Sequence, residues 1–398
     1  MSRCAAVLLA SLINPSAFAA DDLIDAMDSN RFVSPKEKGK AELVEGKFGK
    51  AVRFSFEQGC QNTFFTSRLR GKPEWDRAEG FSFWVKGDGS DSFGGLQLIF
   101  DDDYAVRYDL CFPIRSKEWT KITVAWRDLV PVLPGPKAKP LGLPGGNAPS
   151  KVSTIWVGKW WYWRDYPAQS FALDEIRLEQ KIEQDMKDYQ PEGAPLAHFL
   201  GKLKAGKPVT VVTVGDSLTD TRHWANREVS WPLLLKKHLE AKYGSKVTIL
   251  NPAIGGTQLR QNLVLMPRWL AQAREPDLVT FCFGFNDWDS GMRGAQFRQS
   301  YEDAVDRVRR ATKGKADVLI LTTLPAVERW TTMAELAEAC RAAAKARNAG
   351  LADTERGFRE AGKENRERLY VRDRTHLGPL GHELMAKTAA EAIEQSGR

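Results

Sequence analysis

From about residue 195 onwards, short runs of β-branched and apolar residues alternate with longer helical patterns. This alternation predicts a parallel sheet covered by helices, because parallel strands are joined through long crossover connections that are usually helical. The expected strands are 209–214, 247–250, 278–283 and 318–323, and the expected helices are 196–203, 231–243, 259–273, 296–311, 331–347 and 381–393. Sheets of this class carry their sites at the carboxyl ends of the strands, so a site is expected in the loops that follow them.

Polar and glycine-containing turns follow three of these strands. Ser217 follows the first strand, Gly256 the second and Asn286 the third. Asp373 and His376 lie in the last loop, before the final helix. The serine alone is weak evidence, because Gly, Asp and Ser are ordinary turn residues. Its partners at the same edge of the sheet make it a candidate nucleophile.

These are the residue types that acyl transfer through a serine requires. A serine hydroxyl is a poor nucleophile, so His376 would take its proton while Asp373 holds the imidazole through its other nitrogen. The backbone N–H groups of Ser217 and Gly256 and the side-chain amide of Asn286 would donate to the oxyanion. The residues therefore predict a Ser-His-Asp triad with an oxyanion hole.

Four segments together resemble the four blocks of the SGNH (GDSL-type) esterases and lipases. They are 215–218 (Gly-Asp-Ser-Leu), 251–257 around Gly256, 284–287 around Asn286, and Asp373-x-x-His376. Their order and spacing match the family across the whole second half. The resemblance implies an SGNH hydrolase fold with Ser217 as nucleophile, His376 as base and Asp373 as the orienting acid. It also implies an oxyanion hole of Ser217, Gly256 and Asn286.

The match to this family has two departures and one open choice. Phe285 stands where small residues are common, so it is expected to narrow the pocket and contact the substrate. Leu377 follows the histidine where proline is frequent. Gly255 stays an alternative to Gly256 as the backbone donor.

Other chemistries find no support in the sequence. Ser217 does not lie in G-x-S-x-G, which argues against the nucleophile elbow of the α/β-hydrolases. His198, His223 and His238 have no metal-ligand spacing, so neither a catalytic metal nor a cofactor is expected, and His382 is expected to be structural. The formal charge of +7 is spread along the chain without a basic block, and no Walker motif occurs, so nucleic acid and nucleotides are not expected partners.

The first half of the chain, residues 21–180, shows almost no helical period. Its strand-like segments, separated by Gly, Asp or Pro clusters, predict an all-β jelly-roll sandwich. The expected strands are 51–56, 81–85, 96–100, 104–111, 119–125, 153–157 and 171–178. The runs 80–90 and 171–178 resemble the galactose-binding-like jelly rolls, many of which bind carbohydrate. A linker, 181–195, is expected before the esterase domain, 196–398.

Two further features of the sandwich leave alternatives open. Some galactose-binding-like modules hold a structural calcium, for which Asp174 or Glu175 would be ligands, and two ordinary surface acids are the favoured alternative. The aromatic patch from Trp156 to Tyr166 is the richest in the chain. Trp161 and Trp163 share one strand face and could stack on sugar rings, but rings of this patch could equally fill the core or the domain seam.

The N-terminal 20 residues have the pattern of a secretory signal peptide: an apolar run, 5–12, then small residues before Asp21. Export to the periplasm or the outside is therefore expected, and no segment is long enough to span a bilayer. An apolar helix kept in the fold is the alternative. Exported proteins can form disulfides, and Cys60 with Cys111 is the pair to consider. Cys282 and Cys340 are expected to be buried free thiols.

The leading hypothesis is an exported serine esterase that removes acyl groups, above all acetyl, from poly- or oligosaccharides. A lipase, lysophospholipase or thioesterase would need an apolar acyl groove, and no long apolar insertion lies near the candidate site. A polysaccharide O-acyltransferase would keep the same residues and stays open. A binding protein without activity is disfavoured, because every catalytic position is present. The sequence does not indicate which sugar is bound or the oligomeric state.

Overall fold

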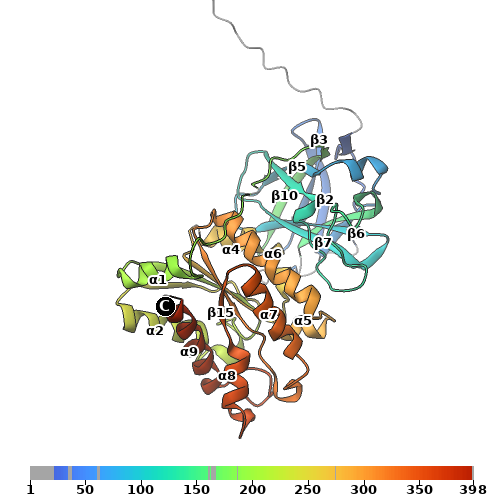
Figure 1. Cartoon of the computed structure of the whole chain (residues 1–398). Helices are drawn as coiled ribbons and strands as arrows, with labels where there is room; N and C mark the ends of the chain where they lie inside the picture. The colour runs from blue at the N-terminus through green and yellow to red at the C-terminus, as the bar shows by residue number, and fades with distance from the viewer. Residues whose placement is uncertain are drawn as a thin grey trace, which may run out of the picture.

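The computed structural model describes residues 22–34, 38–60, 63–159, 162, 167–185, 187–273 and 275–396. Within them the chain forms an N-terminal all-β domain and a C-terminal α/β domain (Figure 1). Both parts of the expected fold class are confirmed. The expected signal peptide, Trp161 and Trp163 lie outside the described residues.

The N-terminal domain is a sandwich of two antiparallel sheets. One has the strand order β2-β3-β10-β5-β8, with β1 paired to β10, and the other has the order β4-β9-β6-β7. The strands are β1 (Leu23–Asp25), β2 (Gly39–Glu45), β3 (Lys50–Phe56), β4 (Thr63–Thr66), β5 (Gly80–Gly87), β6 (Phe93–Phe100), β7 (Asp103–Pro113), β8 (Thr120–Ala125), β9 (Val152–Lys159) and β10 (Gln169–Glu179). Phenylalanines dominate the core between the sheets, with Phe54, Phe83 and Phe171 almost fully buried.

The C-terminal domain is a five-stranded parallel sheet of order β12-β11-β13-β14-β15. Its strands are β11 (Val209–Gly215), β12 (Val247–Leu250), β13 (Leu278–Cys282), β14 (Asp317–Leu321) and β15 (Gly350–Ala352). Its helices are α1 (Ala197–Lys204), α2 (Trp231–Tyr243), α3 (Leu259–Val264), α4 (Met266–Gln272), α5 (Phe285–Asp289), α6 (Gly294–Thr312), α7 (Ala334–Ala346), α8 (Thr354–Ala361) and α9 (Pro379–Gln395). One core joins the sheet to α3, α4, α6 and α7, and the other joins it to α1, α2, α8 and α9.

Three local differences from the expected elements have physical causes. The single helix expected over 259–273 is two helices, because Pro267 lies in the first turn of α4 and cannot continue α3. β15 and α8 are too short to give a periodic signal. β2 is an edge strand that carries lysine and glutamate, so it lacks the apolar alternation by which a strand is recognised.

The sandwich packs on α3 and α4 through the outer face of its second sheet. Phe93, Cys111 and Tyr162 belong to the same buried cluster as the C-terminal helices. The Cys111 thiol donates to the carbonyl oxygen of Val264 at 2.9 Å. Arg260 of α3 reaches back and donates from Nη1 to the Pro131 carbonyl at 3.1 Å. The seam therefore rests on the helices that follow the second loop of the candidate site.

This packing also decides the state of the cysteines. Cys60 lies in the core of the sandwich, whereas Cys111 faces outward into the seam. Both are buried and free, so the pairing considered between them is wrong. Cys282 and Cys340 are buried free thiols as expected. In the part of the chain that the structure covers, no helix is long and apolar enough to cross a membrane.

Candidate active site

Ser217, His376 and Asp373 come together at the carboxyl edge of the sheet. Ser217 follows β11 directly, and the other two lie in the loop before α9. Nε2 of His376 is 2.9 Å from Oγ of Ser217. Nδ1 of His376 is 2.6 Å from Oδ2 of Asp373. These contacts place the imidazole between the hydroxyl and the carboxylate, as general-base activation of a serine requires.

The loop that carries His376 is held by its own backbone. The amide of Val371 donates to the His376 carbonyl at 2.8 Å, and Arg374 adopts a left-handed conformation with φ of 61°. Oδ1 of Asp373 accepts from the amides of Thr375 and His376. Partial burial acts to raise the pKa of Asp373, but the hydrogen bonds from His376 and Thr375 outweigh it and lower that pKa. Asp373 is therefore ionised at neutral pH and can stabilise an imidazolium.

The turn that presents Ser217 leaves little freedom. A Cβ atom on Gly215 would lie 2.3 Å from Oγ1 of Thr219, so the strand-to-turn junction requires glycine. Nδ2 of Asn226 donates to the Ser217 carbonyl at 2.6 Å and to the Asp220 carbonyl at 2.8 Å. The nucleophile is thus fixed relative to the segment that follows it.

The oxyanion donors predicted from the sequence differ in availability. The Gly255 N–H donates to Oδ2 of Asp220, 3.3 Å away, whereas the Gly256 N–H meets no acceptor among the described residues. This difference favours Gly256 as the backbone donor. Nδ2 of Asn286 already donates to Oδ2 of Asp216 at 3.2 Å and to the Thr257 carbonyl at 3.1 Å. Its donation to an oxyanion would therefore be shared with one of these acceptors.

The model of the GDSL-like Lipase/Acylhydrolase family matches residues 213–384, a range that begins in β11 and ends in α9. That range contains the candidate triad and the three predicted oxyanion donors. The match to this family lies entirely within the C-terminal domain.

Solved structures similar to this chain are hydrolases by their descriptions. One is a lipase/acylhydrolase from Enterococcus faecalis, 21% identical over 48% of this chain and 96% of that chain, with a TM-score of 0.39. Another is an acetylxylan esterase from Geobacillus stearothermophilus, 21% identical over 48% of this chain and 96% of that chain, with a TM-score of 0.41. A third is a two-domain esterase active on acetylated mannans, co-crystallised with mannopentaose, 20% identical over 54% of this chain and 57% of that chain, with a TM-score of 0.43. The comparison with curated proteins found no match.

Two buried carboxyl groups, Asp216 and Asp287, are here called the buried pair; Asp216 accepts from the predicted oxyanion donor Asn286, and Asp287 is the next residue after it. Burial raises the pKa of Asp216 to about 6 and that of Asp287 to about 7. Oδ1 of Asp287 accepts from the Leu259 amide at the start of α3, but its Oδ2 has no partner among the described residues. The sequence placed Asp216 in the turn but did not single out Asp287, because its burial depends on how α3 and α5 pack.

A second group that the sequence did not single out stands beside the triad. The ring of His223 stacks on that of His376, with centroids 4.4 Å apart and an interplanar angle of 27°. Trp224 meets His376 edge-on, with centroids 5.7 Å apart, and is 57% exposed. From the sequence, His223 was a candidate only for metal ligation. Its position six residues after Ser217 is the feature of the sequence that could have placed it near the candidate triad.

The predicted substrate contact Phe285 is half-buried next to Asn286. The guanidinium of Arg329 lies over its ring, 4.8 Å from the centroid, and Arg329 also pairs with Asp289. Phe285 therefore borders the oxyanion loop with one ring face covered by arginine.

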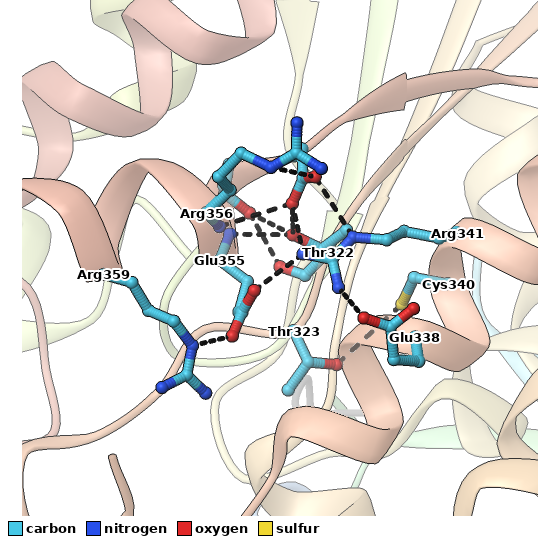
Figure 2. Close-up of polar contacts among 10 residues, drawn as sticks. Thr322, Thr323, Glu338, Cys340, Arg341, Glu355, Arg356 and Arg359 are labelled. Carbon is cyan, nitrogen blue, oxygen red and sulfur yellow. Dashed lines mark hydrogen bonds and ion pairs between the residues drawn. The ribbon is translucent and has the colours of Figure 1, made fainter. Parts of the chain in front are cut away.

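The same loop is supported from behind by the end of β14. A Cβ atom on Gly284 would lie 2.2 Å from Cγ2 of Thr323, and Thr323 donates to the Phe283 carbonyl at 2.9 Å. Figure 2 shows how the neighbouring Thr322 joins a polar network that ties β14 to α7 and α8. Arg341 is its centre and pairs with Glu355 at 2.6 Å. Thr323 therefore supports the loop that carries Asn286, and the network of Thr322 holds the end of β14 in place.

The sandwich domain was expected to offer sugar-stacking rings. Of the aromatic patch, Trp156 lies between Phe64 and Tyr104, with centroids 4.3 and 5.0 Å away, so both faces of the indole are occupied. Tyr162 is buried in the seam and donates to Asp109. For these two rings, the structure agrees with the alternative of a packing role.

The acids considered as calcium ligands are engaged within the protein. Asp174 is fully buried, and its Oδ2 accepts from the amides of Lys47 and Phe48 at 2.6 and 3.0 Å. Glu175 pairs with Arg177 at 2.9 Å. The expectation that both are surface acids is wrong for Asp174. No group of three or more His, Cys, Asp or Glu side chains within the described ranges is arranged to hold a metal ion.

Proposed function

We propose that this protein is a serine esterase that hydrolyses acyl esters of carbohydrates, above all acetyl esters, through an acyl-enzyme on Ser217. The observation that carries the proposal is the continuous path of contacts from Asp373 through His376 to Ser217. The N–H of Gly256, which meets no acceptor among the described residues, supports an esterase, because an open backbone donor is what the oxyanion of an attacked carbonyl requires.

The first half of the reaction acylates the enzyme. Nε2 of His376 removes the proton of Ser217 as Oγ attacks the ester carbonyl, and Asp373 stabilises the imidazolium. The amides of Ser217 and Gly256 and the side chain of Asn286 donate to the oxyanion. When the tetrahedral intermediate collapses, its bond to the sugar oxygen breaks. His376 returns the proton to that oxygen, and the deacylated sugar hydroxyl leaves.

The second half releases the acid. A water molecule takes the place of the sugar and gives its proton to His376 as it attacks the acyl carbonyl. Collapse of the second intermediate breaks the bond to Oγ, and His376 reprotonates Ser217. The carboxylic acid, acetate for an acetyl ester, leaves and the triad is restored.

The preference for a short acyl group rests on the sequence, because no long apolar insertion lies near Ser217, Gly256 or Asn286. A lipase-type reaction would need a sizeable apolar groove next to the nucleophile.

Release of acetate from a panel of acetylated polysaccharides by the full chain tests the proposal directly. Ser217→Ala is expected to lower turnover by about 10⁴-fold or more while leaving thermal unfolding unchanged, because only a half-buried hydroxyl is lost. Preference for esters of eight or more carbons would favour a lipase instead. Transfer of the acyl group to a sugar in place of water would favour an O-acyltransferase.

A further inference from the structure

Trp224 is the most exposed large aromatic side chain in the described part of the chain, at 57%. It belongs to none of the three hydrophobic clusters that the described residues form. A single exposed apolar residue is ordinary on a protein surface and would by itself mean little. Its place is what distinguishes it, because its ring lies 5.7 Å from that of His376.

Trp224 is held rigidly relative to the nucleophile. It begins the short 3-10 helix Trp224–Asn226, which directly follows the Ser217 turn. The His223 amide donates to the Asp220 carbonyl at 3.0 Å, and Asn226 donates to the Ser217 carbonyl at 2.6 Å. The ring of His223 packs against both: it is stacked on His376, with centroids 4.4 Å apart, and its centroid is 5.4 Å from that of the indole. The indole is therefore a preorganised wall and needs no ordering when a ligand arrives.

The exposed part of this wall suits one kind of ligand group. A pyranose ring has a face of C–H groups that is apolar and a rim of hydroxyls that stays hydrated. An indole offers a flat apolar surface while its edge remains wet, so the two surfaces are complementary. A flexible acyl chain would gain less from a flat ring that is open to solvent on one side.

We propose that Trp224 forms a sugar-binding subsite, on which the pyranose that bears the ester packs while its acyl group lies at Ser217. The inference rests on the proposed function, because it names where that esterase holds its carbohydrate. Trp224 sets specificity in this arrangement: it selects an ester on a sugar ring over an ester on a small alcohol.

The test compares two esters that present the same acyl group. One is an acetylated oligosaccharide and the other is ethyl acetate, both followed by acid release in a pH-stat. Nitrophenyl esters are unsuitable, because their aromatic leaving group would itself stack on the indole. Trp224→Ala is expected to lower the ratio of kcat/KM for the oligosaccharide over ethyl acetate about tenfold, mainly through KM. Trp224→Phe keeps a ring and should recover most of the ratio.

Leu233→Ala is the matched control, since Leu233 is 47% exposed on α2 of the same domain and is not part of the site. It should leave both rates unchanged. An unchanged ratio in Trp224→Ala, or a Trp224→Phe variant as impaired as Trp224→Ala, overturns the subsite while the esterase stands. A wild-type protein that cleaves ethyl acetate but no acetylated sugar overturns the proposed function and the subsite together.

Discussion

Aspartates in two regions of one site have opposite surroundings. Asp373 lies at the exposed rim, where two backbone amides and an imidazole donate to it. The buried pair, Asp216 and Asp287, has fewer partners, and one oxygen of Asp287 has none among the described residues. The pKa of Asp373 is lowered, whereas burial raises that of Asp216 to about 6 and that of Asp287 to about 7.

The comparison teaches that the balance between burial and N–H donors, more than the residue type, decides whether a carboxyl group is charged here. A carboxylate that must stabilise a neighbouring positive charge has to remain ionised, and the rim supplies the hydrogen bonds that achieve this. The carboxyl groups of the buried pair also accept hydrogen bonds, but burial outweighs these and raises both pKa values. They act on structure, since Asp216 accepts from Leu218 and Asn286 while Asp287 accepts at the start of α3.

The largest expected effect on turnover comes from substitution of Asp373 at the rim of the site. Asp373→Asn replaces the acceptor of His376 Nδ1–H by an amide that can hold the wrong tautomer of the imidazole. Turnover is expected to fall by about 10⁴-fold. Steady-state kinetics on an acetyl ester, with thermal denaturation as a check of folding, measures it. A variant that keeps a tenth of wild-type turnover would show that Asp373 is not the orienting acid.

Asn286 is the proposed oxyanion donor, and its amide also donates to Asp216 of the buried pair. Asn286→Ala is expected to lower kcat by about 10²- to 10³-fold with a small change in KM, since the donor acts mainly in the transition state. Asn286→Asp, which has no amide donor, serves as the second variant. Near-normal turnover in both would leave the oxyanion hole to the backbone amides of Ser217 and Gly256.

Much of the α/β domain could be predicted because its information is local. Strand-to-turn junctions and the spacing of Gly-Asp-Ser, Gly-Gly, Asn-Asp and Asp-x-x-His are visible in the sequence, and parallel topology gathers them at one edge. Pro267 also gave a local signal of the break between α3 and α4 that the helical period concealed.

The features that sequence reasoning missed depend on contacts between distant segments. Trp224 is an ordinary surface residue until the last loop brings His376 beside it. Asp287 is fully buried, and the residues next to it in the sequence do not indicate this burial. Asp174 looks like a surface acid on a strand but is covered by the turn between β2 and β3. Packing decides each of these cases, and local pattern does not.

The buried side of the comparison predicts the smallest effect on turnover. Asp287→Asn has the same shape as the protonated acid, and its amide oxygen can still accept from the Leu259 N–H. Turnover on an acetyl ester is therefore expected to stay within a few-fold of wild type at pH 7. A loss of turnover as large as that of Asp373→Asn would contradict the assignment of a structural role to Asp287.

Stability should reveal the same residue through its pH dependence. The pKa of Asp287 is raised from an ordinary 3.8 to about 7, so between about pH 4 and 7 the folded protein keeps a proton that the unfolded chain has lost. The free energy of unfolding of the wild type must then fall as the pH rises through this window, by an amount on the order of a few kcal/mol at most.

Asp287→Asn has no such proton, and Asp216 accounts for a smaller fall of the same sign up to about pH 6. In thermal denaturation, the melting temperature of Asp287→Asn relative to that of the wild type is therefore expected to be higher at pH 8 than at pH 5. A difference in melting temperature that does not change with pH would mean that Asp287 is ionised in the folded protein, and the contrast with Asp373 would disappear.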